Sequence, residues 1–172
     1  MKFTKRNLLI TTTIIVTVAL DQISKVLVRA NIVERTNSNP GEQISLIGDA
    51  FIMMNVRNEG AFLGMGSELN ETLRIILLLI LPILVLVFVL RYIFKDKSLD
   101  SWSLIAFSAI IGGGIANIYD RIVYGSVTDF LFIDLGSVFK TGIFNVADMG
   151  VTFGMIILVI MSFKKKKTNM TT

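Results

Sequence analysis

Chemistry in this chain must come from the side chains of Asp, Glu, Lys, Ser, Thr, Tyr or Asn, or from the backbone, because its sequence contains neither Cys nor His. Their absence excludes disulfides, a Cys nucleophile, a Ser/His/Asp triad and the usual imidazole zinc site. In the stretch IFNVADMGVTFG, residues 143–154, Asn145 and Asp148 stand where an apolar run begins. A carboxylate at the edge of hydrocarbon is costly unless it pairs, reaches water or takes part in a reaction. These residues therefore need a framework that explains their position.

Membrane-spanning helices are the elements that would position these residues. The 172 residues are 53% hydrophobic and only 17% charged, and the mean hydropathy is +0.70, far from the average of soluble proteins. Roughly 20 apolar residues cross a bilayer, and four runs are long enough. They cover about residues 8–28, 72–90, 101–119 and 146–163. We predict a single integral membrane domain over residues 1–172, with an all-α core and a kink at Pro82 in the second span.

Positive charges between the apolar runs predict how the chain is oriented. Lys and Arg gather before the first run, between the second and third, and after the fourth. Cytoplasmic flanks carry such an excess, so we expect both termini in the cytoplasm. The Lys run at residues 164–167 is read as a membrane anchor and not as a nucleic-acid site. A cleaved signal peptide ending at residues 28–30 is the alternative, but the region before that site is long and is charged at Asp21, Lys25 and Arg29.

The segment of residues 31–70 is expected to fold into short strands. EQISLIGDAFIMMNVRNEGAFLGMG mixes Ile, Val, Phe and Met with polar residues and Gly turns, which is typical of strands joined tightly. The segment is also relatively poor in positive charge, so we expect its strands on the extracytoplasmic side, folded onto the membrane surface.

Polar residues of the apolar runs gather at one depth, near the outer surface. They are Asp21, Lys25, Asn117, Asp120, Arg121, Asn145 and Asp148. The inner halves of the second, third and fourth runs hold no charge, whereas an ion pathway would need polar residues through the whole thickness. The pattern favours a site at the membrane boundary.

Taken one at a time, these residues also have simple structural explanations. Asp21 and Lys25 are four residues apart on one helix face and can neutralise each other. Asn117 can bridge two helices, and Asp148 can be stabilised by the dipole at a helix N-terminus. The glycines at residues 112–114 indicate close helix packing.

Five motifs carry more information together than singly. They are DQISK at residues 21–25, NEGAF at 58–62, GGGIANIYDR at 112–121, GSVTDF at 125–130 and FNVAD at 144–148. In this order and setting, the chain resembles the lipoprotein signal peptidases, signal peptidase II, over nearly its whole length. Two departures are visible: Ala116 stands where that family often has Gly, and Glu59 follows Asn58. Neither puts a catalytic role in doubt.

The resemblance implies four spans, an extracytoplasmic β-cradle and a catalytic pair of aspartates, Asp129 and Asp148. It implies a supporting set made of Asp21, Lys25, Asn58, Gly60, Asn117, Asp120, Arg121 and Asn145. The implied enzyme lies in the bacterial cytoplasmic membrane, with its site near the outer face. It cleaves prolipoproteins immediately before a diacylglyceryl-modified Cys. We expect no metal or other cofactor, no nucleic acid, contact with membrane lipids, and a functional monomer.

The chemistry available to these residues agrees with that implication. Two carboxylates that share a proton can hydrolyse an amide, because one activates water while the other polarises the carbonyl. Asp129 is expected on an outer loop after the third span and Asp148 at the top of the fourth, so folding can bring them together. The proton is assigned to neither residue, because coupled groups titrate as a pair.

Two other functions fit parts of the pattern. A channel or transporter subunit would explain the intramembrane charge but not the paired outer aspartates; its polar translocation site would consist of Asp21, Lys25, Asp120 and Arg121. A Ser/Lys peptidase could use Ser24 or Ser126 with Lys25. Ser24 and Lys25 are adjacent, however, and point about 100° apart on a helix.

Overall fold

Four long helices and a small sheet make up the described part of the chain. The computed structural model describes residues 4–60, 66 and 69–170. The helices are α1 (Lys5–Asn31), a second span made of α2 (Glu71–Ile75), η2 (Ile76–Ile80) and α3 (Leu81–Lys95), then α4 (Ser101–Tyr124) and α5 (Val146–Met170). Four helices of the described part are long and apolar enough to cross a membrane, which confirms the expected helical core.

The helices extend beyond the apolar runs because polar residues cap them. Thr4, Asn70 and Asp100 each accept a hydrogen bond, at 3.2, 2.9 and 3.0 Å, from the backbone N–H three residues ahead. These contacts satisfy N–H groups that a helix start leaves without partners. α4 ends at Gly125, whose positive φ of 73° suits a residue without Cβ.

The second span is irregular at the position where a kink was expected. The five π-helical residues of η2 come directly before α3, and Pro82 is the second residue of α3. Proline has no N–H to donate to the preceding turn, and π-helical segments are a common form of helix irregularity.

Three consecutive glycines let α4 approach three different helices. A Cβ at Gly112 would lie 2.8 Å from Thr17 of α1, and one at Gly114 would lie 2.8 Å from Leu86 of α3. A Cβ at Gly113 would collide with the Ala147 carbonyl at the start of α5. Successive residues point about 100° apart on a helix, so the three glycines serve three neighbours. The expectation of close packing is confirmed.

The sheet is built around one central strand. β3 (Phe51–Asn58) pairs in parallel with β1 (Glu34–Arg35) and antiparallel with both β2 (Gln43–Ile47) and β4 (Val127–Ile133). β4 corrects one expectation, because Asp129 lies on this strand and not on a loop. The sequence VTDFLFI is rich in β-branched and aromatic residues, and its partner strand comes about 70 residues earlier in the chain.

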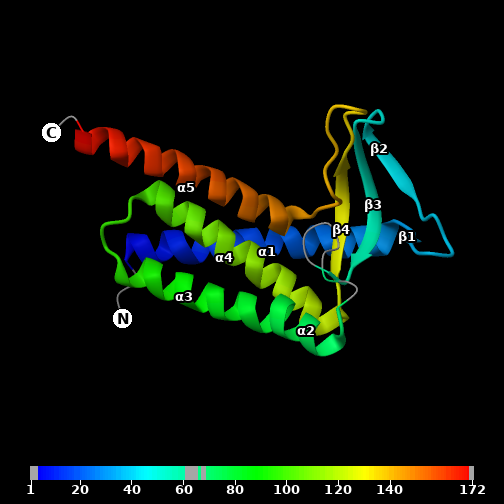
Figure 1. Ribbon diagram of the computed structural model, residues 1–172, viewed down its shortest axis with the longest axis horizontal. Coiled ribbons are helices and arrows are strands. Elements are labelled where there is room, and N and C mark those ends of the chain that lie inside the picture. Colours follow the sequence, from blue (N-terminus) through cyan, green and yellow to red (C-terminus); the bar gives the residue numbers. More distant parts are fainter. Residues whose placement is uncertain (1–3, 61–65, 67–68, 171–172) are drawn as a thin grey trace.

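The sheet lies across one end of the helical bundle, with its strands running transverse to the helices (Figure 1). Val28 and Ile32 at the end of α1 form a buried cluster with Phe130 and Leu131 of β4. A second cluster at the other end, including Ile10, Ile93 and Leu104, joins α1, α3 and α4. The sheet is therefore packed onto the bundle at the end where α4 stops and α5 starts.

Candidate active site

The two aspartates singled out from the sequence line one small pocket. Asp129 comes from β4 and Asp148 from the first turn of α5. The pocket has a volume of about 60 Å³, which is enough for a water molecule. Its lining consists of Asn58, Asn117, Arg121, Val127, Asp129, Ile143 and Asp148. Sheet and bundle thus meet at a polar pocket that carries two carboxyl groups.

Asp129 is almost completely buried, with 3% of its surface exposed. Its Oδ1 accepts a hydrogen bond of 2.6 Å from Asn145 Nδ2, and its Oδ2 accepts one of 2.8 Å from Asn58 Nδ2. The pKa of Asp129 is raised to about 6, chiefly by burial and also by the nearby charge of Asp148, against the lowering effect of the two donors. A carboxyl in this setting keeps its proton at a pH where ordinary aspartates are ionised.

Asp148 is held by a reciprocal pair of hydrogen bonds with Asn145. The Asn145 side-chain oxygen accepts from the Asp148 N–H at 2.9 Å, and Asp148 Oδ2 accepts from the Asn145 N–H at 3.1 Å. This arrangement is a capping box, which satisfies two free N–H groups at the start of a helix. The cap of α5 therefore fixes the direction in which the Asp148 carboxylate points.

Asn117 connects Asp148 to a buried cation. Its Nδ2 donates to Asp148 Oδ1 at 2.9 Å. Its Oδ1 accepts from Lys25 Nζ at 2.8 Å and from Asn145 Nδ2 at 3.2 Å. Since the ammonium group of Lys25 can only donate, it requires the amide oxygen of Asn117 on its side and leaves the amide N–H groups facing Asp148.

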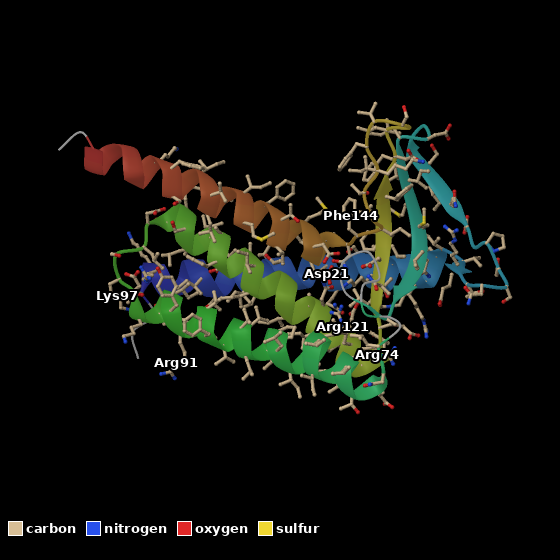
Figure 2. The ribbon with its side chains drawn as sticks, viewed as in Figure 1. Asp21, Arg74, Arg91, Lys97, Arg121 and Phe144 are labelled. Carbon is tan, nitrogen blue, oxygen red and sulfur yellow. The ribbon has the colours of Figure 1, made fainter. Side chains whose placement is uncertain are left out.

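Lys25 lies in a buried ion cluster beneath the pocket. Its Nζ is 2.8 Å from Asp21 and 3.0 Å from Asp120, and all three side chains are 0% exposed. Asp21 Oδ1 accepts from the Ala147 N–H at 2.8 Å, and Asp120 Oδ2 accepts from the Thr128 N–H at 3.3 Å. The cluster thereby joins α1 and α4 to the residues that precede both Asp129 and Asp148. Figure 2 places Asp21 and Arg121 at the junction of bundle and sheet.

Arg121 holds the start of the segment that follows β3. Its Nη2 donates to the Gly60 carbonyl at 2.7 Å and its Nη1 to the Asn117 carbonyl at 3.3 Å. The Gly60 N–H in turn donates to Asn58 Oδ1 at 3.0 Å, which turns the Asn58 amide N–H groups toward Asp129. Ala61 and Phe62 of the NEGAF motif lie outside the described residues. All ten residues singled out from the sequence are joined in one hydrogen-bonded network.

Three further residues of this network were not singled out from the sequence. Gln22 Nε2 donates to Asp120 Oδ1 at 2.9 Å. Arg29 Nη1 donates to the Thr128 hydroxyl at 2.9 Å, and its guanidinium stacks 4.4 Å from the centre of the Tyr124 ring. The sequence did contain a signal for Arg29, because it continues the four-residue spacing of Asp21 and Lys25 along one helix face.

The Ser/Lys alternative finds no support in this geometry. The Ser24 hydroxyl donates to the Asp21 carbonyl at 2.7 Å, and the Lys25 ammonium is shared between Asp21, Asp120 and Asn117. In the described part of the chain, no group of three or more His, Cys, Asp or Glu side chains could hold a metal ion.

Comparisons with known proteins agree with the fold and the motifs. A family model described as signal peptidase (SPase) II matches residues 13–164. A lipoprotein signal peptidase of Borrelia duttonii is 35% identical over 173 residues, covering 96% of this chain and 98% of that protein. One of Moorella thermoacetica is 34% identical over 140 residues, covering 81% of this chain and 83% of its own. A solved bacterial membrane enzyme matches with a TM-score of 0.75 and 24% identity, over 92% of this chain and 90% of that chain.

Proposed function

Because the chain belongs to the signal peptidase II family, we propose that it is a membrane aspartic endopeptidase that removes signal peptides from prolipoproteins. Asp129 and Asp148 are its catalytic pair. The observation that carries this proposal is their placement in one pocket by two separate elements, β4 and α5. Asn145 contacts both residues and keeps them in a fixed relation.

The proposed reaction uses one proton shared by the two carboxyl groups. The ionised carboxylate takes a proton from water, whose oxygen then attacks the scissile carbonyl carbon. The protonated carboxyl donates a hydrogen bond to the carbonyl oxygen, where negative charge develops. When the C–N bond breaks, a proton passes to the leaving amine. The raised pKa of Asp129, about 6, supports a pair that retains one proton.

The proposed substrate is a prolipoprotein with a diacylglyceryl-modified Cys, cut immediately before that Cys. The pocket lies at the junction of bundle and sheet, where α4 ends and α5 begins. This position suits a peptide bond at the membrane boundary. Arg91 and Lys97 lie at the opposite end of the bundle (Figure 2). Their charge supports an orientation with that end and both termini in the cytoplasm and the sheet outside it.

A mobility-shift assay on a lipidated precursor tests the proposal. The wild-type protein should convert the precursor to the shorter mature form, and Asp129→Asn and Asp148→Asn should each abolish conversion. The matched control is Asp134→Asn. Asp134 lies outside the pocket and is paired with Lys140 at 2.8 Å, so this variant should keep wild-type activity. Elution and thermal unfolding in detergent check that each variant is folded. Substantial turnover by either purified pocket variant would refute the catalytic pair.

A further inference from the structure

The sheet ends in a tip of exposed apolar side chains. Ile47 is 68% exposed, Leu135 52%, Val138 85% and Phe139 55%. Single exposed apolar residues are ordinary, but a contiguous group of large ones usually marks a surface that contacts a partner or a membrane. We call these four residues the apolar tip.

Two loops far apart in the sequence form this tip. Ile47 stands at the turn between β2 and β3, where it pairs with Phe51, and Phe51 pairs with Ile133 at the end of β4. The Asp134 N–H donates to the Ala50 carbonyl at 3.0 Å, and the Leu135 N–H donates to the Phe139 carbonyl at 2.8 Å. The backbone bonds therefore hold both loops together as one unit.

The tip projects sideways from the bundle. The strands run across the helix axes, and the turn between β2 and β3 lies beside the loop after β4, past α5 (Figure 1). Measured along the direction of the helices, the two loops lie at about the same level as the first turn of α5 (Figure 1). Because α5 is one of the four candidate spans, the tip lies beside the end of a membrane-spanning helix. β1, by contrast, lies farther from the bundle along the helix axes (Figure 1).

We propose that the apolar tip inserts into the membrane beside α5, at the boundary between headgroups and acyl chains. The candidate span α5 exposes apolar side chains of its own, such as Phe153 at 56% and Met155 at 50%, so lipids that cover α5 can also cover the tip beside it. Lys140, the cation next to the tip, is paired with Asp134 at 2.8 Å, and Asp49 in the turn between β2 and β3 adds a negative charge. Insertion is therefore driven by burial of apolar surface and not by attraction to anionic lipid.

Insertion of the tip has a consequence for the pocket. β4 carries Asp129 at its third residue and leads directly into the loop of Leu135, Val138 and Phe139. A tip held by lipid would support β4 at the end away from α4 and would keep this strand level with the membrane surface. This inference rests on the membrane-spanning helices and not on the proposed activity.

Fluorescence of a single tryptophan in lipid vesicles tests the inference. Trp102 is the only native tryptophan, so the full-length chain is prepared as Trp102→Phe with Phe139→Trp. In vesicles containing lipids brominated close to the headgroup, this tryptophan should be quenched several-fold more than in the matched control, Trp102→Phe with Val33→Trp. Val33 precedes β1 and is 54% exposed. Raised salt should leave the quenching unchanged.

Other results would overturn the inference. Equal quenching at residues 139 and 33 would mean that the tip lies in water. Emission that shifts only when a precursor peptide is added would mean that the tip binds peptide, and emission that depends on the protein-to-lipid ratio would mean that it contacts a second copy. Val138→Trp in the same background repeats the test if the residue-139 variant does not fold.

Discussion

Asn145 and Asp148 cap each other at the start of α5, through hydrogen bonds of 2.9 and 3.1 Å between the side chain of each and the backbone N–H of the other. Asn145 also donates to Asp129 at 2.6 Å. One side chain therefore begins a helix, directs one aspartate and contacts the other. The stability of the helix start and the geometry of the pocket are coupled through this residue.

Replacing Asn145 should separate these two roles. Asn145→Ser keeps a good cap but loses the amide donor to Asp129, so the stability supplied by the cap should be retained while the cleavage rate falls about ten- to a hundred-fold, the value of a lost hydrogen bond to a charged group. Asn145→Ala should lose a further 1 kcal/mol or so of stability with the cap. Thermal unfolding and cleavage kinetics measure the two effects. Equal unfolding midpoints for the Ser and Ala variants would contradict the capping role.

The stability of the protein should fall between about pH 4 and about pH 6 because of Asp129. Its pKa is about 6 in the folded protein, above its ordinary value of 3.8, so the folded state binds this proton more tightly than the unfolded state. The resulting stabilisation is complete below pH 3.8 and is lost as the pH rises through about 6. At about 1.4 kcal/mol per pH unit, the loss is about 3 kcal/mol.

Asp129→Asn should remove this pH dependence, since the amide does not titrate. The unfolding midpoint of the wild type, measured relative to the variant at each pH, should drop by several degrees across the interval. Asp134→Asn is the control, because its pKa is lowered by Lys140 and the wild-type decline should persist. A wild-type curve parallel to that of Asp129→Asn would contradict the raised pKa.

Gly113 should tolerate a methyl group less well than Gly114. A Cβ at residue 113 meets the backbone carbonyl of Ala147, next to Asp148, whereas a Cβ at residue 114 meets the end of the flexible Leu86 side chain. Gly113→Ala should destabilise the protein by about 1–3 kcal/mol, as overpacking does, and should reduce cleavage, because α5 must move. Gly114→Ala is the matched control. Similar losses of stability and activity in both variants would contradict this assignment.

Lys25 should be far more important to stability than an exposed lysine with a similar partner distance. Lys25→Met leaves Asp21 and Asp120 without their buried counter-charge, which typically costs about 3–5 kcal/mol. Lys140→Met removes a surface pair with Asp134 and should cost far less, because ion pairs at the surface contribute little to stability. Unfolding midpoints in detergent compare the two. If both substitutions lower the midpoint equally, the buried cluster does not carry the stability assigned to it.

The proposed substrate predicts that lipid on the precursor matters. A precursor without the diacylglyceryl group should be cleaved poorly, because the modified Cys would no longer be held at the membrane boundary beside the pocket. The same precursor with and without lipid is compared at equal concentration in the mobility-shift assay. Equal rates for the two forms would contradict lipid-dependent binding while leaving the catalytic pair intact.

Much of the helical core could be predicted from the sequence, because long apolar runs have one stable arrangement in a membrane. The strand β4 could not be predicted in the same way. VTDFLFI follows α4 after a short turn; its composition favours a strand, but the segment is short and its partner β3 lies about 70 residues earlier. The close approach of Gly112, Gly113 and Gly114 was predictable, but the helix that each one faces depends on the tertiary arrangement.

The polar residues near the pocket were predictable as a set because charges are costly in a membrane. Which of these residues contact each other was only partly predictable. Asp21 and Lys25 share a helix face, and the structure adds Asp120 to that pair. Thr128 was overlooked, since a threonine in a strand carries no signal of its own, yet its N–H contacts Asp120 and its hydroxyl contacts Arg29.

The three glycines of α4 also constrain the order in which the protein can be assembled during synthesis. The ribosome releases α1 and the second span before α4, so the partners of Gly112 and Gly114 are already in the bilayer when α4 arrives. The contact at Gly113 waits for α5, which is translated after α4 and brings Asp148. Since domains tend to fold from the N-terminus during synthesis, the nascent chain stays without its second pocket aspartate until α5 leaves the translocon.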